Sequence, residues 1–184
     1  MIIFTVNNLK PGLALGFLFL IISPSYAKYS RAEWQYGKDT KKNCISTRGE
    51  VLIARSMEPV VMNKSKCSVR SGKWADYYYP EFHTMASEVE IDHVVSLKNA
   101  HDNGGADWSA AKKRKFANDT TNLVITKKTY NRIKGAHGID GWLPVHKAYA
   151  CKYVRDWLKI KKKYSLGITI PERKAADALK GHCH

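Results

Sequence analysis

The sequence predicts an α+β domain with additional helices, held together by disulfide bonds. Two short segments rich in Val and Ile, residues 89–95 and 122–126, are typical of β-strands. Longer segments carry apolar residues at helical spacing, most clearly 145–164. The four cysteines are an even number, as disulfide-bonded domains require. These observations predict a small mixed fold with few strands, several helices and covalent cross-links.

The first 27 residues have the pattern of a secretory signal peptide. A short polar start ends at Lys10, an apolar run covers 13–22, and small residues Ser25 and Ala27 precede the expected cleavage point. A membrane anchor is the alternative, but the apolar run is shorter than the roughly 20 residues that span a bilayer. We therefore expect residues 28–184 to form one domain, secreted to the periplasm or the outside, without stable membrane association and as a monomer.

Before the first strand, the chain reads as an arm, a helix and an irregular segment. Residues 28–43 are polar apart from Trp34 and Tyr36, which predicts a loosely packed arm. Residues 47–56 predict a short helix with Val51 and either Leu52 or Ala54 facing inward. Residues 63–80 contain Gly, Pro and a Tyr-Tyr-Tyr run, which predicts a loop or a short hairpin.

The second half alternates strands and helices. A capping box formed by Thr169 and Glu172, with Pro171 in the first turn, marks the start of a last helix that ends near Gly181. The remaining elements are expected as follows: strand 89–95, helix 109–118, strand 122–126, helix 127–135 closed by Gly135, loop 138–144 and helix 145–164.

The chain is strongly basic, with a formal net charge of +15. Removal of residues 1–27 takes away one charge, that of Lys10, and leaves +14. So high a charge on a small domain indicates a polyanionic partner, such as nucleic acid, an acidic polysaccharide or an anionic lipid surface. Solvated helix faces are the plainer explanation of the basic residues, although a balanced surface would also carry acids.

The cysteines allow three disulfide connectivities. The simplest joins neighbours in sequence, Cys44 with Cys67 and Cys151 with Cys183. A tetrahedral zinc site is the alternative, but the spacings are long and irregular and lack a Cys-x-x-Cys pair.

Asp92 and His93 place an acid beside an imidazole in a short apolar strand. Side chains alternate along a strand, so these two would face opposite sides. They can serve one site only if the strand ends or bulges there. Otherwise His93 is a core histidine and Asp92 a surface acid. We expect Glu88 and Glu90 to lie on a solvated strand face, with a hydrogen bond that supports a metal ligand as the alternative. We expect His83 to be a surface or capping group, with a spare metal ligand as the alternative.

Further polar residues follow at suggestive spacing. Asn122 opens the second strand, and Lys127, Asn131 and Lys134 share one face of the helix after it. Carboxylate and amide oxygens are suitable ligands for Mg²⁺, and Mn²⁺ or Zn²⁺ would also fit. A neutral imidazole can take a proton from water, and lysines can hold phosphate. These are the parts that one-metal phosphodiester hydrolysis needs.

In their order, five segments resemble the secreted HNH endonuclease family, which is related to the C-terminal nuclease domain of GmrSD restriction enzymes. They are 90–97, 116–119, 122–123, 131–135 and 142–144, and the resemblance extends over nearly all of residues 28–184.

The resemblance implies a ββα-metal fold, in which a β-hairpin and a helix surround one divalent ion. It also implies roles for individual residues. Asp92 and Asn131 would be metal ligands, His93 the general base, Asn122 a clamp for the base-bearing loop and Lys134 a lysine near the scissile phosphate. Arg48 is a weaker candidate for phosphate contact, with a surface salt bridge as the alternative. The local cysteine pairing also agrees with the family pattern.

The sequence thus predicts a secreted, metal-dependent endonuclease that cleaves DNA, or RNA, with little sequence specificity. The alternative is a non-catalytic basic protein that binds nucleic acid or acidic glycans. A secreted toxin that acts on rival cells would share the nuclease chemistry.

Overall fold

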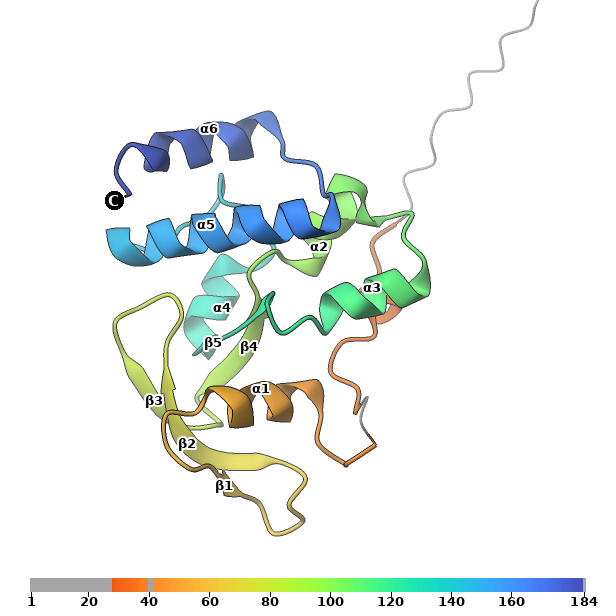
Figure 1. The fold of residues 1–184 in the computed structure, drawn as a ribbon, viewed down its shortest axis with the longest axis vertical. Coiled ribbons are helices and arrows are strands. Elements are labelled where there is room, and N and C mark those ends of the chain that lie inside the picture. Colours follow the sequence, from red (N-terminus) through yellow and green to blue (C-terminus); the bar gives the residue numbers. More distant parts are fainter. Residues whose placement is uncertain (1–27, 40–41, 184) are drawn as a thin grey trace, which may run out of the picture.

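The computed structural model describes residues 28–39 and 42–183, so the expected signal peptide lies outside the described residues. Figure 1 shows three tiers. Helices α5 (Lys147–Tyr164) and α6 (Ile170–Lys180) lie side by side at the top. Helix α1 (Thr47–Arg55) and a three-stranded sheet are at the bottom. A separate pair of strands lies between them. The α+β class is confirmed.

The three-stranded sheet has the order β1-β2-β3 and is antiparallel throughout. Its strands are β1 (Val61–Met62), β2 (Val69–Ala75) and β3 (Phe82–Met85). The segment expected as a loop or short hairpin therefore supplies the central strand. Helix α1 packs on β2, where the buried Trp74 indole donates to the Leu52 carbonyl oxygen at 2.8 Å. Of the two alternatives for α1, Leu52 faces inward and Ala54 is exposed.

The second sheet is the antiparallel pair β4 (Val89–His93) and β5 (Leu123–Lys127), in which His93 lies opposite Leu123 and Val89 opposite Lys127. Helix α4 (Lys128–Lys134) follows β5 directly and ends at Gly135, whose φ of +53° suits a glycine. The two strands and α4 make the strand-strand-helix unit that was predicted, with boundaries shifted by one or two residues.

The segment between β4 and β5 holds more helix than expected. Helix α2 (Leu97–Ala100) begins at the side-chain cap of Ser96 and runs into a π-helical turn, η2 (His101–Gly105). Helix α3 (Ala110–Ala117) follows, capped by Ser109 as predicted. Short π turns leave no periodic apolar signal in the sequence, so they are hard to predict.

The prediction of a loosely packed arm at 28–43 was wrong for its aromatic part. Trp34 ends a short 3-10 helix, η1 (Arg31–Trp34), and its side chain is fully buried. It packs against Phe116 of α3 with ring centroids 5.5 Å apart. A single buried Trp offsets the polarity of the residues around it, because burial of a large aromatic ring outweighs a local polar composition.

Two hydrophobic clusters fill the molecule. The smaller one lies between α1, the three-stranded sheet and one face of β4–β5. The larger one lies between η1, α2, α3, the other face of β5 and α5, and includes Trp34, Tyr78, Val124, Tyr153 and Trp157. The strands β4 and β5 therefore separate the two clusters. Polar groups at the ends of these strands lie where the two clusters end.

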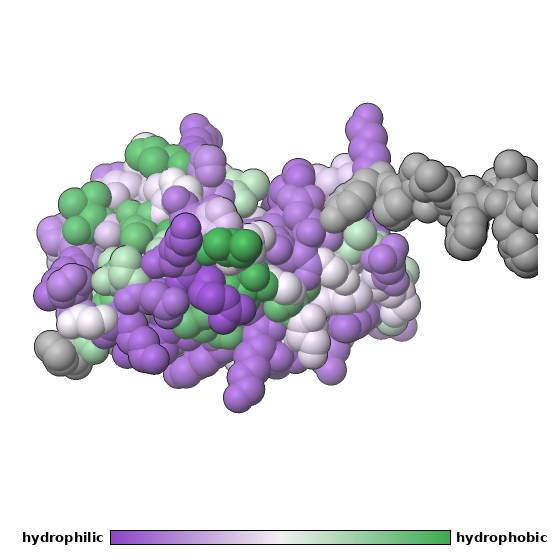
Figure 2. Space-filling model, turned by 90° about the horizontal axis from the view of Figure 1, so that it is seen from above, coloured by the Kyte–Doolittle hydropathy of each residue, from purple (hydrophilic) through white to green (hydrophobic). Residues whose placement is uncertain are grey.

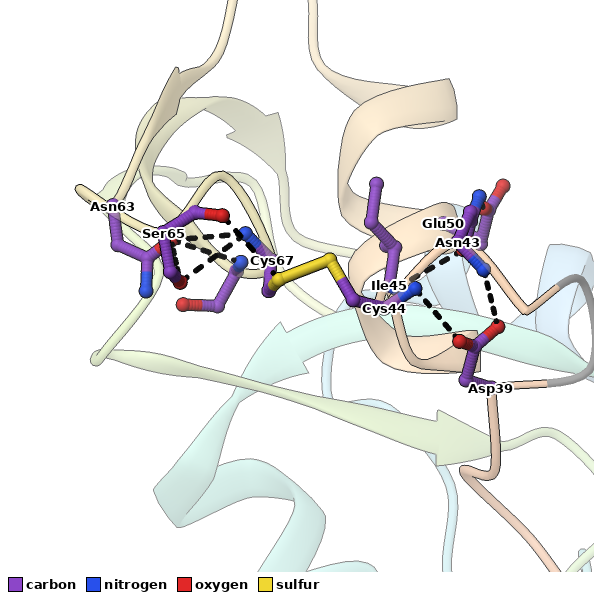
Figure 3. The surroundings of a disulfide bond; sticks show 9 residues. Asp39, Asn43, Cys44, Ile45, Glu50, Asn63, Ser65 and Cys67 are labelled. Carbon is purple, nitrogen blue, oxygen red and sulfur yellow. Dashed lines mark hydrogen bonds between the residues drawn. A yellow bond between two sulfur atoms is a disulfide. The ribbon is translucent and has the colours of Figure 1, made fainter.

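Both disulfides join cysteines that are neighbours in sequence, Cys44 with Cys67 and Cys151 with Cys183. Around the first bond, shown in Figure 3, Asp39 accepts from the backbone N–H of Cys44 at 2.7 Å. Asn63 accepts from the N–H of Cys67 at 3.1 Å on the other side. These side chains hold the irregular segments on both sides of the bond.

Helix α6 shows the predicted capping box, in which Thr169 and Glu172 exchange hydrogen bonds. Glu172 is its one buried residue and also accepts from the Asn99 side chain at 2.6 Å. Figure 2 shows the side of the molecule where α6 lies, and hydrophilic residues cover most of it. No helix in the described part of the chain is long and apolar enough to cross a membrane.

Candidate active site

The end of strand β4 brings Asp92 and His93 to one pocket. The pairing of β4 with β5 is regular, with His93 opposite Leu123 and Asp92 opposite Val124. In a regular strand successive side chains face opposite sides, so those of Asp92 and His93 do as well. The strand ends at His93, which is the condition under which both could serve one site. Both residues, together with Asn131 of α4, line a pocket of about 520 Å³. Three of the predicted site residues therefore meet in one place.

The ring of His93 is held by a backbone carbonyl. Its Nε2 lies 2.8 Å from the Ala117 carbonyl oxygen, which can only accept, so Nε2 carries the proton. In the neutral ring Nδ1 is then the nitrogen with the free lone pair. Burial lowers the pKa of His93 to about 4, against the opposing effect of the Ala117 bond. His93 is therefore neutral at neutral pH and able to accept a proton at Nδ1.

Two side chains contact Asp92 through the same carboxylate oxygen, Oδ2. The Tyr78 hydroxyl donates to Oδ2 at 2.6 Å, and the Lys134 ammonium lies 2.9 Å from the same oxygen. Neither contact uses Oδ1, and Asp92 lines the pocket. The carboxylate can thus offer Oδ1 to a cation or water while Oδ2 is held.

Lys134 takes a different place from the one expected. Its side chain is fully buried, and its ammonium also donates to the His93 carbonyl oxygen at 2.9 Å. It is not among the residues that line the pocket. In this arrangement Lys134 cannot touch a phosphate in the pocket, and its charge is used to balance Asp92 and to hold the end of β4.

Asn131 presents its amide oxygen in a similar way. The amide nitrogen donates to Glu90 Oε2 at 2.7 Å, which leaves the oxygen Oδ1 as an acceptor. Glu90 also lies 4.0 Å from the Arg132 guanidinium. Of the two alternatives for Glu90, a solvated strand face and a supporting hydrogen bond, the structure shows the second, because Glu90 accepts from the Asn131 amide.

Asn122 is fully buried and holds the chain that follows His93. Its Oδ1 accepts from the Val95 N–H at 2.9 Å, and its amide nitrogen donates to the Val95 carbonyl at 3.2 Å. Its backbone carbonyl accepts from the Val94 N–H. Asn122 therefore lies where a clamp for the segment after His93 is needed, and it has no direct access to the pocket.

Two of the predicted substrate contacts lie away from this pocket. Arg48 donates to the carbonyl oxygens of Ala86 and Val89, at 2.7 and 3.0 Å, and forms no salt bridge within residues 28–39 and 42–183. Lys127 lies 3.8 Å from Glu81 at the far end of β5. Both side chains stabilise the turns beside the strand pair, and neither lines the pocket.

Sequence reasoning missed two cations that do line the pocket, Arg31 of η1 and Lys98 of α2. Lys98 pairs with Asp102 at 2.6 Å. Arg31 is exposed, lies 5.9 Å from the centre of the Tyr36 ring and forms no ion pair with a carboxylate among the described residues. No periodic pattern marks either residue as part of the pocket. Arg31 comes from the N-terminal arm, which the burial of Trp34 anchors in the core.

Two groups of side chains could hold a divalent cation. The first is the pair of oxygens from Asp92 and Asn131. The second is Asp76, Glu81 and His83, whose ligand atoms lie within 4.8 Å of one another. In that group the Asp76 carboxylate already accepts from four donors and lies 2.9 Å from His83. The donors are Tyr78 N, Tyr79 N, Thr126 Oγ1 and Lys127 N.

A carboxylate that is engaged so fully acts as a hydrogen-bonding centre, because a cation would have to displace its donors. The expectation that His83 is a surface or capping group was wrong, since it is buried against Asp76. The donor set of Asp92 and Asn131 fits a hard divalent cation better. It supplies two oxygens at a pocket wide enough for the waters that complete the coordination of Mg²⁺.

Comparison with known proteins gives three findings. An uncharacterised secreted protein of Arthroderma benhamiae is 35% identical over 157 residues, which cover 84% of this chain and 76% of that protein. No solved structure matches the chain. Residues 47–175, which include Asp92, His93, Asn122 and Asn131, match the family described as GmrSD restriction endonucleases, C-terminal domain. The chain therefore belongs to this family and carries its nuclease-type domain.

Proposed function

We propose that the protein is a secreted, metal-dependent endonuclease of the HNH type that hydrolyses phosphodiester bonds of DNA, or RNA, with little sequence specificity. One observation carries the proposal: a neutral histidine with a free Nδ1 shares a pocket with two oxygens that suit a divalent cation. Membership of the nuclease family supports the same chemistry.

In the proposed reaction His93 Nδ1 takes a proton from the attacking water. Nε2 stays bonded to the Ala117 carbonyl, so the ring keeps one orientation while its charge changes. Asp92 and Asn131 would hold the cation, most suitably Mg²⁺, with Mn²⁺ or Zn²⁺ as other options. When bound, such a cation neutralises the charge that develops on the phosphate and on the leaving oxygen. Asn122 keeps the segment after His93 in place.

The substrate would be held chiefly through its phosphates. The chain has a formal charge of +15, and Arg31 and Lys98 flank the pocket. Contacts to phosphate carry no sequence information, which accounts for the low specificity that we propose. By analogy with the family, the products have 5′-phosphate and 3′-hydroxyl ends. The secreted relative and the signal-like residues 1–27 support export.

A basic protein without catalytic activity is the competing proposal, because the net charge alone would give nucleic-acid binding. The two proposals differ at Asp92. A binder should tolerate the neutral substitution Asp92→Asn, whereas the nuclease should lose its cation and with it cleavage.

The test uses oxidised residues 28–184 with supercoiled plasmid or with RNA, in Mg²⁺ or in EDTA. We expect nicking and linearisation in Mg²⁺, none in EDTA, and none for Asp92→Asn. The matched control is Asp107→Asn, which removes the same charge from an exposed position. The competing proposal would be favoured if the wild type binds the plasmid, as seen in a gel shift, but cleaves neither plasmid nor RNA in Mg²⁺, Mn²⁺ or Zn²⁺.

A further inference from the structure

The hydroxyl of Tyr78 lies against the carboxylate on which the proposed metal centre depends. We propose that Tyr78 is a positioning residue whose hydroxyl fixes Asp92 Oδ2, so that Oδ1 faces the pocket and binds the divalent cation. This inference rests on the function proposed above. It assigns a role to a residue that belongs to none of the sequence motifs.

Tyr78 reaches Asp92 from outside the β4–β5 pair. It lies in the loop between β2 and β3, whereas Asp92 is on β4, and the two side chains meet at 2.6 Å. The Tyr78 side chain is fully buried. Its ring packs edge-on against Trp142 and Tyr153, with centroid distances of 4.8 and 5.6 Å. The ring therefore has little freedom, and its hydroxyl is held in one place.

The backbone of Tyr78 is fixed as firmly as its ring. Its N–H donates to Asp76 Oδ1 at 2.8 Å, and the same carboxylate accepts from the Lys127 N–H at 2.7 Å. The N–H of Tyr77 donates to the Ile125 carbonyl at 3.0 Å. These bonds join the tyrosine loop to β5, the partner strand of β4. The position of the Tyr78 hydroxyl relative to Asp92 is thus set by the strand pair itself.

Two groups contact Asp92 Oδ2, and they act differently on a cation. The Lys134 ammonium carries a positive charge 2.9 Å from the carboxylate, so it stabilises Asp92 but repels a divalent cation. The Tyr78 hydroxyl is neutral, so it orients the carboxylate without this repulsion. Partners that hold the distal atom of a metal ligand typically raise metal affinity by roughly 10–100-fold. We assign this role to Tyr78.

The matched pair Tyr78→Phe and Tyr153→Phe tests the assignment. Both substitutions remove a hydroxyl from fully buried rings of one aromatic cluster. The Tyr153 hydroxyl has no hydrogen-bond partner within the described part of the chain. Mn²⁺ is the probe, and its dissociation constant is measured by electron paramagnetic resonance on oxidised residues 28–184. We expect Tyr78→Phe to weaken Mn²⁺ binding by roughly 10–100-fold, and Tyr153→Phe to match the wild type.

Equal Mn²⁺ affinity in Tyr78→Phe and the wild type overturns the role of Tyr78. Asp92→Asn separates this result from failure of the metal centre. If Asp92→Asn and the wild type bind Mn²⁺ alike, the centre itself is wrong and the role of Tyr78 falls with it.

A second measurement needs no variant. When Mg²⁺ is added to the wild type, the ¹³C resonances of Asp92 Cγ and Tyr78 Cζ should shift together, while that of Tyr153 Cζ should stay. A shift of Asp92 without one of Tyr78 would contradict the proposal even if Tyr78→Phe did not fold.

Discussion

His93 combines two properties that a general base needs, an oriented ring and a neutral charge. The Ala117 carbonyl provides the first through Nε2, and burial provides the second by lowering the pKa to about 4. In the unfolded chain the pKa of a histidine is about 6.5. Between these two values the unfolded chain binds a proton that the folded protein does not.

This difference predicts how stability depends on pH. As the pH falls from about 6.5 to 4, buried His93 costs the folded metal-free protein more and more free energy, because stability falls wherever the unfolded state binds more protons. His93→Gln lacks this cost. We compare the free energies of unfolding of His93→Gln and the wild type, measured in urea at pH 7 and at pH 4.5. As the pH is lowered, the difference between them should shift by about 2 kcal/mol in favour of the variant. Parallel curves for the two proteins would show that His93 titrates normally.

Arg31 is the residue that we expect to hold substrate phosphate at the pocket. It is exposed, has no carboxylate partner among the described residues and lies in the wall of the pocket. Arg31→Ala should raise the DNA concentration at half-maximal cleavage about tenfold, as expected for a lost hydrogen bond to a charged group. Its free energy of unfolding should stay within about 0.5 kcal/mol of the wild type.

The control for this prediction is Arg70→Ala on β2, an exposed arginine that does not line the pocket. If the two variants raise the half-maximal concentration equally, Arg31 contributes only to the overall charge. If neither changes it, Arg31 is not a contact.

At this scale the sequence pointed to three residues that meet at the pocket, but not to the residues that support them. Asp92 and His93 are adjacent, and Asn131 lies on the next helix face, so local spacing and family resemblance were enough to find them. Tyr78 and Arg31 come from segments with no periodic signal, and tertiary contacts alone bring them to the pocket. Lys134 was identified, but its burial depends on how α4 packs on β4 and cannot be read from spacing.

Among the elements, helix α6 is tied to α5 by a disulfide bond just beyond its C-terminal end. It buries one residue, Glu172, whose carboxylate lies 3.6 Å from the buried Lys161 ammonium. Burial lowers the pKa of that lysine to about 8. Ala175, Ala176 and Leu179 also pack against the core, but they are only partly buried. The hydrophobic contribution of α6 is therefore limited, and we expect the bond between Cys151 and Cys183 to supply much of its attachment.

Removal of this disulfide should therefore release α6 before the rest of the molecule. For Cys151→Ser with Cys183→Ser, which opens a loop of 32 residues, we expect a loss of about 3–4 kcal/mol in unfolding free energy. Amide hydrogen exchange in 170–180 should become much faster, while β4 and β5 remain protected.

The matched control is the other disulfide. Cys44→Ser with Cys67→Ser opens a loop of 23 residues and should leave exchange in α6 unchanged. Equal exchange in α6 for both double variants would mean that Glu172 and its partners hold the helix without the covalent link.

The boundaries of most elements were predictable because their signals are local. The caps at Ser109 and Thr169 and the glycine after α4 all occur where the sequence placed them. The η1 helix and the π turn η2 were not predictable, because the first depends on a distant pocket for Trp34 and the second on the junction of two short turns.

For the whole molecule, the strand pair β4–β5 is the feature that links fold to function. It separates two hydrophobic clusters and ends where both meet polar residues. One cluster fixes the Tyr78 ring, and the other supports Ile91 and Leu123 next to His93. The net charge of +15 would attract a polyanion to the whole molecule, whereas the proposed chemistry is confined to one pocket. Binding and cleavage should therefore be separable by mutation.

The central claim is that His93 is the base of a nuclease. The most direct test compares His93→Ala with His137→Ala. His137 is an exposed histidine outside the pocket and serves as the control. Plasmid cleavage in Mg²⁺ and plasmid affinity in EDTA are measured on the same preparations of residues 28–184. We predict that His93→Ala loses cleavage by on the order of 10²–10⁴-fold and keeps its affinity, while His137→Ala matches the wild type in both. Cleavage by His93→Ala at the wild-type rate would contradict the account.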